Sequence, residues 1–192
     1  MYLSQVFFDS GFVVPELDRV VSSVSEDRAF VVIDGYHGFM ARPTNLGAIQ
    51  DRVFFLAGGY KYAMAGEGVC FLHSPPGYGA RPIDTGWYAG FGQLESGVSG
   101  QIPYGKDGSR FAGATYDVSG IYRMQAVLGW LEESGVAVAD IRTHVVDLQN
   151  LLLATASLPG ELIPPPAHER GNFLTFQSEG AGDITEPCTN GE

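Results

Sequence analysis

The chain has 192 residues, 45% of them hydrophobic, and a formal net charge of -11 at pH 7. This length allows a sizeable core in one domain, or in one domain and part of a second. The negative charge argues against nucleic acid and anionic membranes as partners, because both attract clustered Lys and Arg side chains. No apolar run is long enough to span a bilayer. Two cysteines, Cys70 and Cys188, are too few for a disulfide framework, so a reducing cytoplasm is expected.

The first part of the chain alternates apolar runs with helical patterns. Strands are expected over residues 2–8, 29–33 and 53–57, and the second of these is a continuous apolar run typical of a parallel strand covered on both faces. A helix opening at Pro15 and a short helix over residues 46–50 lie between them. This β-α-β-α-β order predicts parallel strands joined by right-handed crossovers.

The centre of the chain adds one strand and a long irregular connection. Residues 69–73 read as a strand, and the link Gly66-Glu67-Gly68 before it is too short for a parallel crossover, so this strand should be antiparallel. Residues 74–119 are rich in Gly, Pro and aromatic side chains. A connection of that length is usually functional.

The last part of the chain is predicted to contain two helices and one strand, at residues 121–133, 138–156 and 173–176. The patterns together predict an α/β fold with a mainly parallel sheet and one antiparallel strand. We expect a large domain, a smaller α+β domain and an irregular tail, over residues 1–119, 120–177 and 178–192.

Two strand ends place an acid and a lysine at one edge of the predicted sheet. Asp34 follows the second strand, and Lys61 follows the third after a double-glycine turn. The carboxyl ends of parallel strands meet at one edge, where open α/β sheets bind ligands, so the two side chains should lie close together. Such a lysine can form a Schiff base with pyridoxal phosphate, while the carboxylate pairs with the pyridine nitrogen.

Each of these residues also has a simpler interpretation when taken alone. Asp34-Gly35 could be a strand-ending turn, Lys61 a solvated surface lysine, and His37 a hydrogen-bonded loop histidine. The hypothesis of a cofactor site rests on their falling at the same sheet edge with a role for each.

Three short segments carry a family resemblance: DGYH at residues 34–37, GGYKY at 58–62 and TGW at 85–87. They resemble the pyridoxal-phosphate region of class V aminotransferases, which have fold type I, and are most similar to kynureninases. The resemblance implies a three-layer large domain, a homodimer, and hydrolytic Cβ–Cγ cleavage of a kynurenine-like amino acid. It also implies that the chain corresponds to the middle-to-late half of such an enzyme.

The resemblance assigns roles residue by residue. It implies that Lys61 is the Schiff-base lysine and Asp34 the partner of the pyridinium nitrogen. His37 and Tyr60 would line the cofactor, with Tyr60 at its phosphate. Trp87 would lie near the phosphate, as a contact from the same or the partner subunit.

Two later segments add weaker assignments. RGNFLTF at residues 170–176 resembles the family's small-domain strand, whose arginine holds the substrate α-carboxylate, so Arg170 is the candidate for that bidentate contact. FAGATYD at residues 111–117 loosely matches a segment near the cofactor and makes Thr115 a candidate.

Other functions stay open. A simple transaminase would use the same cofactor apparatus, and a non-catalytic fragment could serve only to pair with another subunit. A cysteine desulfurase is disfavoured, because residues 155–169 contain no cysteine and Cys70 is expected to be buried in a strand. A metal hydrolase would have to use four residues whose spacing matches no standard ligand motif: Asp34, His37, His73 and Asp84.

Overall fold

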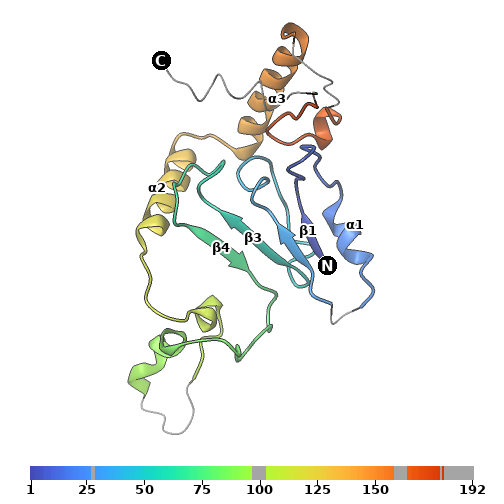
Figure 1. Ribbon diagram of the computed structural model, residues 1–192. Coiled ribbons are helices and arrows are strands. Elements are labelled where there is room, and N and C mark those ends of the chain that lie inside the picture. The colour runs from blue at the N-terminus through green and yellow to red at the C-terminus, as the bar shows by residue number, and fades with distance from the viewer. Residues whose placement is uncertain (27–28, 97–102, 158–163, 178, 180–192) are drawn as a thin grey trace.

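A four-stranded sheet forms the centre of the structure, a computed structural model that describes residues 1–26, 29–96, 103–157, 164–177 and 179. The strands lie in the order β1-β2-β3-β4 (Figure 1) and comprise Tyr2–Ser4, Val32–Asp34, Phe54–Gly58 and Cys70–His73. β1, β2 and β3 pair in parallel, and β4 is antiparallel to β3. The predicted α/β fold, with a mainly parallel sheet and one antiparallel strand, is confirmed.

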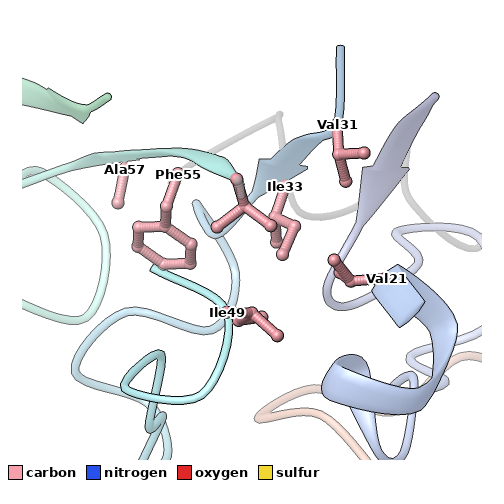
Figure 2. Close-up of a cluster of buried hydrophobic side chains, with 7 residues drawn as sticks. Val21, Val31, Ile33, Ile49, Phe55 and Ala57 are labelled. Atoms are coloured by element: carbon pink, nitrogen blue, oxygen red, sulfur yellow. The ribbon is translucent and has the colours of Figure 1, made fainter. Parts of the chain in front are cut away.

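The core lies against one face of this sheet. Side chains alternate between the two faces of a strand, so Ile33 of β2 and Phe55 of β3 point into the same cluster. Helix α1 (Leu17–Ser22) adds Val21 from the β1–β2 crossover (Figure 2). Val32 is only half-buried, so β2 is not covered equally on both faces by the described residues. The full cluster is Val21, Val31, Ile33, Ile49, Val53, Phe55 and Ala57.

The predicted short helix over residues 46–50 is wrong. The segment forms successive turns instead, in which the Ile49 amide donates to the Leu46 carbonyl at 2.8 Å and the Arg52 amide donates to the Ile49 carbonyl at 2.9 Å. Ile49 is 5% exposed and belongs to the core, because the chain must bring it inward just before β3 begins. Burial of this single side chain overrides the local helical pattern.

The second part of the chain contains the two predicted helices. α2 spans Ser119–Glu133 and α3 spans Val138–Thr155, which confirms both predictions to within two residues. The Asp140 carboxylate accepts from the Ala137 amide at 2.9 Å and so stabilises the start of α3. No helix among the described residues is long and apolar enough to cross a membrane.

Three 3₁₀ helices complete the described elements: Trp87–Ser96, Gly108–Phe111 and Ala167–Glu169. The strand predicted over residues 173–176 is absent. The chain bends at Asn172 and Phe173, and this region joins the rest of the structure through an isolated antiparallel bridge between Arg170 and Phe12. Of the predicted tail, only residue 179 lies among the described residues.

Arg142 of α3 holds the segment that follows the last 3₁₀ helix. Its Nη2 donates to the carbonyls of Ala167 at 2.7 Å and Arg170 at 2.5 Å. Its Nη1 donates to the Asn172 side chain at 3.1 Å and to the Gly171 carbonyl at 3.4 Å. One guanidinium therefore fixes the path of residues 167–172.

We expect Arg142→Ala to lower the free energy of unfolding by about 2–3 kcal/mol, because it leaves several carbonyls of a partly buried segment without a donor. Urea unfolding followed by circular dichroism measures the change. Arg19→Ala is the matched control, since the described residues give the Arg19 side chain no partner other than Glu16 at the surface, where it is 77% exposed. Equal losses in the two variants would contradict the role of Arg142.

Candidate functional site

The carboxyl ends of β2 and β3 form one edge of the sheet, as the sequence predicts. β2 ends at Asp34, which is in register with Leu56 of β3, and β3 ends at Gly58, three residues before Lys61. A pocket of about 330 Å³ opens at this edge, near the lower size limit of about 300 Å³ for small-molecule sites. It is lined by Ser4, Val6, Phe8, Asp34, Tyr36, His37, Tyr60 and Lys61.

The double-glycine turn brings the lysine into this pocket. A Cβ on Gly58 would lie 2.4 Å from the Tyr36 ring, and a Cβ on Gly59 would lie 2.5 Å from the Val69 side chain. Only glycine at both positions allows this close packing. The turn leaves the Lys61 Nζ 5.8 Å from the centre of the Tyr36 ring and 5.7 Å from that of Tyr60, within the range of cation–π attraction.

Lys61 and His37 are in direct contact. The Lys61 Nζ lies 2.5 Å from the His37 Nε2. Burial, and then the charge of Lys61, lowers the pKa of His37 below its ordinary value of 6.5. His37 is therefore neutral at pH 7, so its Nε2 accepts from the lysine and its Nδ1 carries the proton. That Nδ1 is buried and has no hydrogen-bond partner among the described residues.

The Asp34 carboxylate is held by two donors. Its Oδ1 accepts from the Tyr36 amide at 2.9 Å, and its Oδ2 accepts from the Tyr2 hydroxyl at 2.7 Å. The hydrogen bond to Asp34 is the main reason that the pKa of Tyr2 is raised, which keeps the phenol protonated as a donor. Tyr2 thus orients the carboxylate from the neighbouring strand β1.

The structure does not bring Trp87 or Thr115 to this pocket. Trp87 begins the first 3₁₀ helix, is 55% exposed, and contacts the rings of Tyr88 and Phe91 at 5.4 and 5.7 Å. Thr115 is exposed in the connection before α2. In Figure 1 the green 3₁₀ helices lie beyond the end of the sheet where β4 finishes, opposite the carboxyl ends of the parallel strands.

Arg170 is buried close to the site but is engaged elsewhere. It is 6% exposed, and its guanidinium donates to the Pro165 carbonyl at 3.1 Å and to the Asn150 side chain at 3.2 Å. Three residues later, however, the ring of Phe173 packs against His37 with centroids 5.3 Å apart. The segment that carries Arg170 therefore borders the pocket, while the guanidinium itself does not line it.

Sequence reasoning missed Tyr2, Phe8, Tyr36 and Phe173. The first two could have been found, because alternate residues of the first predicted strand share a face, and Ser4 and Phe8 both line the pocket. No sequence signal links Phe173 to His37, since their contact depends on how the last part of the chain folds back.

The four residues of the metal-hydrolase alternative do not form a ligand set in the described part of the chain. No group of three or more His, Cys, Asp or Glu side chains there could hold a metal ion. His73 of β4 instead contacts the Gln50 carbonyl at 2.9 Å.

Comparison with known proteins gives a fold but no sequence relative. No family model and no curated protein matches the sequence. The apo cysteine desulfurase of Thermococcus onnurineus NA1 superposes with a TM-score of 0.74 at 16% identity, covering 98% of this chain and 47% of that one. The chain has the fold of cysteine desulfurases. The cysteine desulfurase CsdA of Escherichia coli (S-sulfonic acid) also matches, with a TM-score of 0.66 and 18% identity over 94% of this chain and 43% of its own.

The desulfurase fold confirms the coarser prediction, a partial match to the fold type I architecture of class V aminotransferases. The chain spans about half the length of the two solved structures. The finer prediction of a kynureninase gains no support from them.

The expectation that Cys70 is buried is wrong, because it is exposed in β4. Burial, and then Cys70, raises the pKa of Tyr36, so the thiol lies beside a residue that lines the pocket. Cys70 is therefore accessible, and its position no longer counts against a cysteine desulfurase. The absence of a cysteine from residues 155–169 still holds.

Proposed function

We propose that this chain supplies the lysine-bearing part of a pyridoxal-phosphate-dependent active site that acts on an amino acid. The observation that carries the proposal is the meeting of Lys61, His37 and Asp34 in one pocket at the carboxyl edge of the sheet. The desulfurase fold supports it independently of these residues.

The residues present fit the cofactor. Bound at this edge, pyridoxal phosphate supplies an electron sink for the reacting amino acid. Lys61 offers the amine for attachment, and no carboxylate among the described residues forms an ion pair with it. The buried Nδ1 of His37 is a free donor that faces no protein acceptor there.

The other residues of the pocket orient these groups. Asp34 would pair with the pyridine nitrogen, and its hydrogen bonds from the Tyr2 hydroxyl and the Tyr36 amide hold the carboxylate in place for that role. Tyr60 is 42% exposed at the rim, where its hydroxyl can donate to a phosphate oxygen. His37 orients the Lys61 Nζ by accepting one of its hydrogens at Nε2.

Three reactions on an amino acid are compatible with this apparatus. The segments DGYH and GGYKY favour hydrolytic Cβ–Cγ cleavage of a kynurenine-like substrate. Amino-group transfer would use the same lysine, aspartate and histidine. We also propose that the chain forms a homodimer, as the same resemblance implies. Analytical sedimentation measures its oligomeric state.

The third reaction, cysteine desulfuration, is favoured by the fold and by the exposed thiol of Cys70 beside Tyr36. In that reaction the Cβ–S bond of the substrate cysteine would break, its sulfur would join the Cys70 sulfur as a persulfide, and the proton given up by the Cys70 thiol would balance the hydrogen gained at Cβ of the released alanine. Mass spectrometry of the protein after incubation with pyridoxal phosphate and cysteine detects the added sulfur. Its absence from Cys70 leaves cleavage and amino-group transfer.

We expect the purified chain to develop a visible absorbance band when pyridoxal phosphate is added. Borohydride reduction followed by peptide mapping identifies the amine that carries the cofactor. The label should lie on Lys61, because Lys61 alone of the two lysines faces Asp34 and His37. A label on Lys106 would contradict the assignment, and the absence of any band would show that this chain does not capture the cofactor.

A further inference from the structure

Three aromatic rings contact the imidazole of the half-buried His37. The Phe173 ring meets it edge-on, with centroids 5.3 Å apart and an interplanar angle of 66°. Phe8 lies at 5.4 Å and Tyr62 at 6.4 Å. Phe8 and Phe173 also contact each other at 5.9 Å, so they form a continuous wall beside the imidazole.

The position of Phe173 is fixed by the backbone around it. The Gly171 amide donates to the Gly11 carbonyl at 2.6 Å, and the Val13 amide donates to the Glu169 carbonyl at 2.8 Å. Gly11 has φ +67°, and a Cβ there would lie 3.1 Å from the Phe173 carbonyl oxygen. The last described segment is thereby held against the residues that follow β1, with the Phe173 ring directed at His37.

His37 itself has few restraints of its own. It lies in a turn, in which the amides of Gly38 and Phe39 both donate to the Gly35 carbonyl, at 2.9 and 2.8 Å. The second side-chain torsion of histidine is broad, so the backbone alone does not decide which ring nitrogen faces Lys61. We infer that the surrounding aromatic rings set the orientation of the imidazole.

We propose that Phe173 is a positioning residue for Lys61. Its ring shields one side of the half-buried His37 and holds Nε2 toward the lysine amine, which keeps that amine directed into the pocket beside Asp34. This inference rests on the proposed function, because it takes Lys61 as the amine that reacts with the cofactor. The geometry of the four side chains is independent of any cofactor.

The test follows the titration of His37 by NMR without cofactor. The titratable groups that face His37 are Lys61, Asp34 and Tyr62. Burial is the main reason that the pKa of His37 is lowered, so Phe173→Ala should raise this pKa toward 6.5. Phe173→Leu should raise it less, and Phe173→Tyr, which keeps the ring, should leave it low. An unchanged pKa in both Phe173→Ala and Phe173→Leu overturns the proposal.

A second readout is the rate at which pyridoxal phosphate is trapped on Lys61. Misplacement of the amine should slow trapping about tenfold in Phe173→Ala, with recovery in Phe173→Tyr. Phe176→Ala is the control, because Phe176 shares the groove along α3 with Phe173 but is not among the rings that contact His37 in the described residues, and it should leave both readouts unchanged. Trapping that fails in every variant while the His37 shift is observed contradicts the proposed function and leaves the role of Phe173 intact.

Discussion

Lys61→Ala is expected to abolish the covalent capture of pyridoxal phosphate by this chain. The variant removes the amine that faces Asp34 and His37, and no other lysine lines the pocket. The absorbance band and the product of borohydride reduction should both disappear. The fold should survive, because Lys61 is only partly buried and lies outside the core cluster.

Lys106→Ala is the matched control for this experiment. Lys106 lies in the connection between the 3₁₀ helices and lines a separate pocket with Asp107 and Ser109. Capture by this variant should equal that of the parent chain. If Lys61→Ala retains the band and Lys106→Ala loses it, the pocket at the sheet edge is not the cofactor site.

The second large effect is expected in the core. Phe55→Ala should lower the free energy of unfolding by about 3–5 kcal/mol, through lost burial and the cavity left behind. Phe55 is 4% exposed and packs against Phe71, with ring centroids 6.2 Å apart. This loss is a large share of the stability of about 5–15 kcal/mol that is usual for a domain. Urea unfolding measures it.

The same substitution should also loosen the site. A Cβ on Gly35 would lie 2.1 Å from the Phe55 ring, so this ring packs directly against the turn between Asp34 and His37. Phe91→Ala is the control, because Phe91 is 52% exposed, and its loss should cost about 1 kcal/mol or less. Similar losses in the two variants would show that Phe55 does not anchor the core.

The match to desulfurases establishes the fold, whereas the residues of the pocket carry the proposal of a cofactor site. Identities of 16% and 18% over about half of each solved structure show the fold alone. The proposal of a cofactor site depends instead on Lys61, His37 and Asp34, whose placement is a property of this chain. Substrate and reaction type therefore have to come from the experiments on Lys61 and Cys70.

The sequence by itself determined the local elements and the sheet edge. Apolar periodicity predicted β1 to β4, α2 and α3, and the rule that crossovers join parallel strands placed Asp34 and Lys61 together. These features follow from short-range patterns and from general constraints on chain connections. They do not depend on which distant side chains happen to meet.

Only the tertiary structure decided what depends on distant contacts. Ile49 enters the core and breaks the predicted helix, and Phe173 meets His37 in place of forming a strand. Arg170 is occupied by the Asn150 side chain, and Cys70 is exposed because it points to the face of β4 opposite Phe71, which packs against the core cluster. Each outcome reflects the burial or hydrogen-bonding energy of partners far apart in the chain, which no local pattern records.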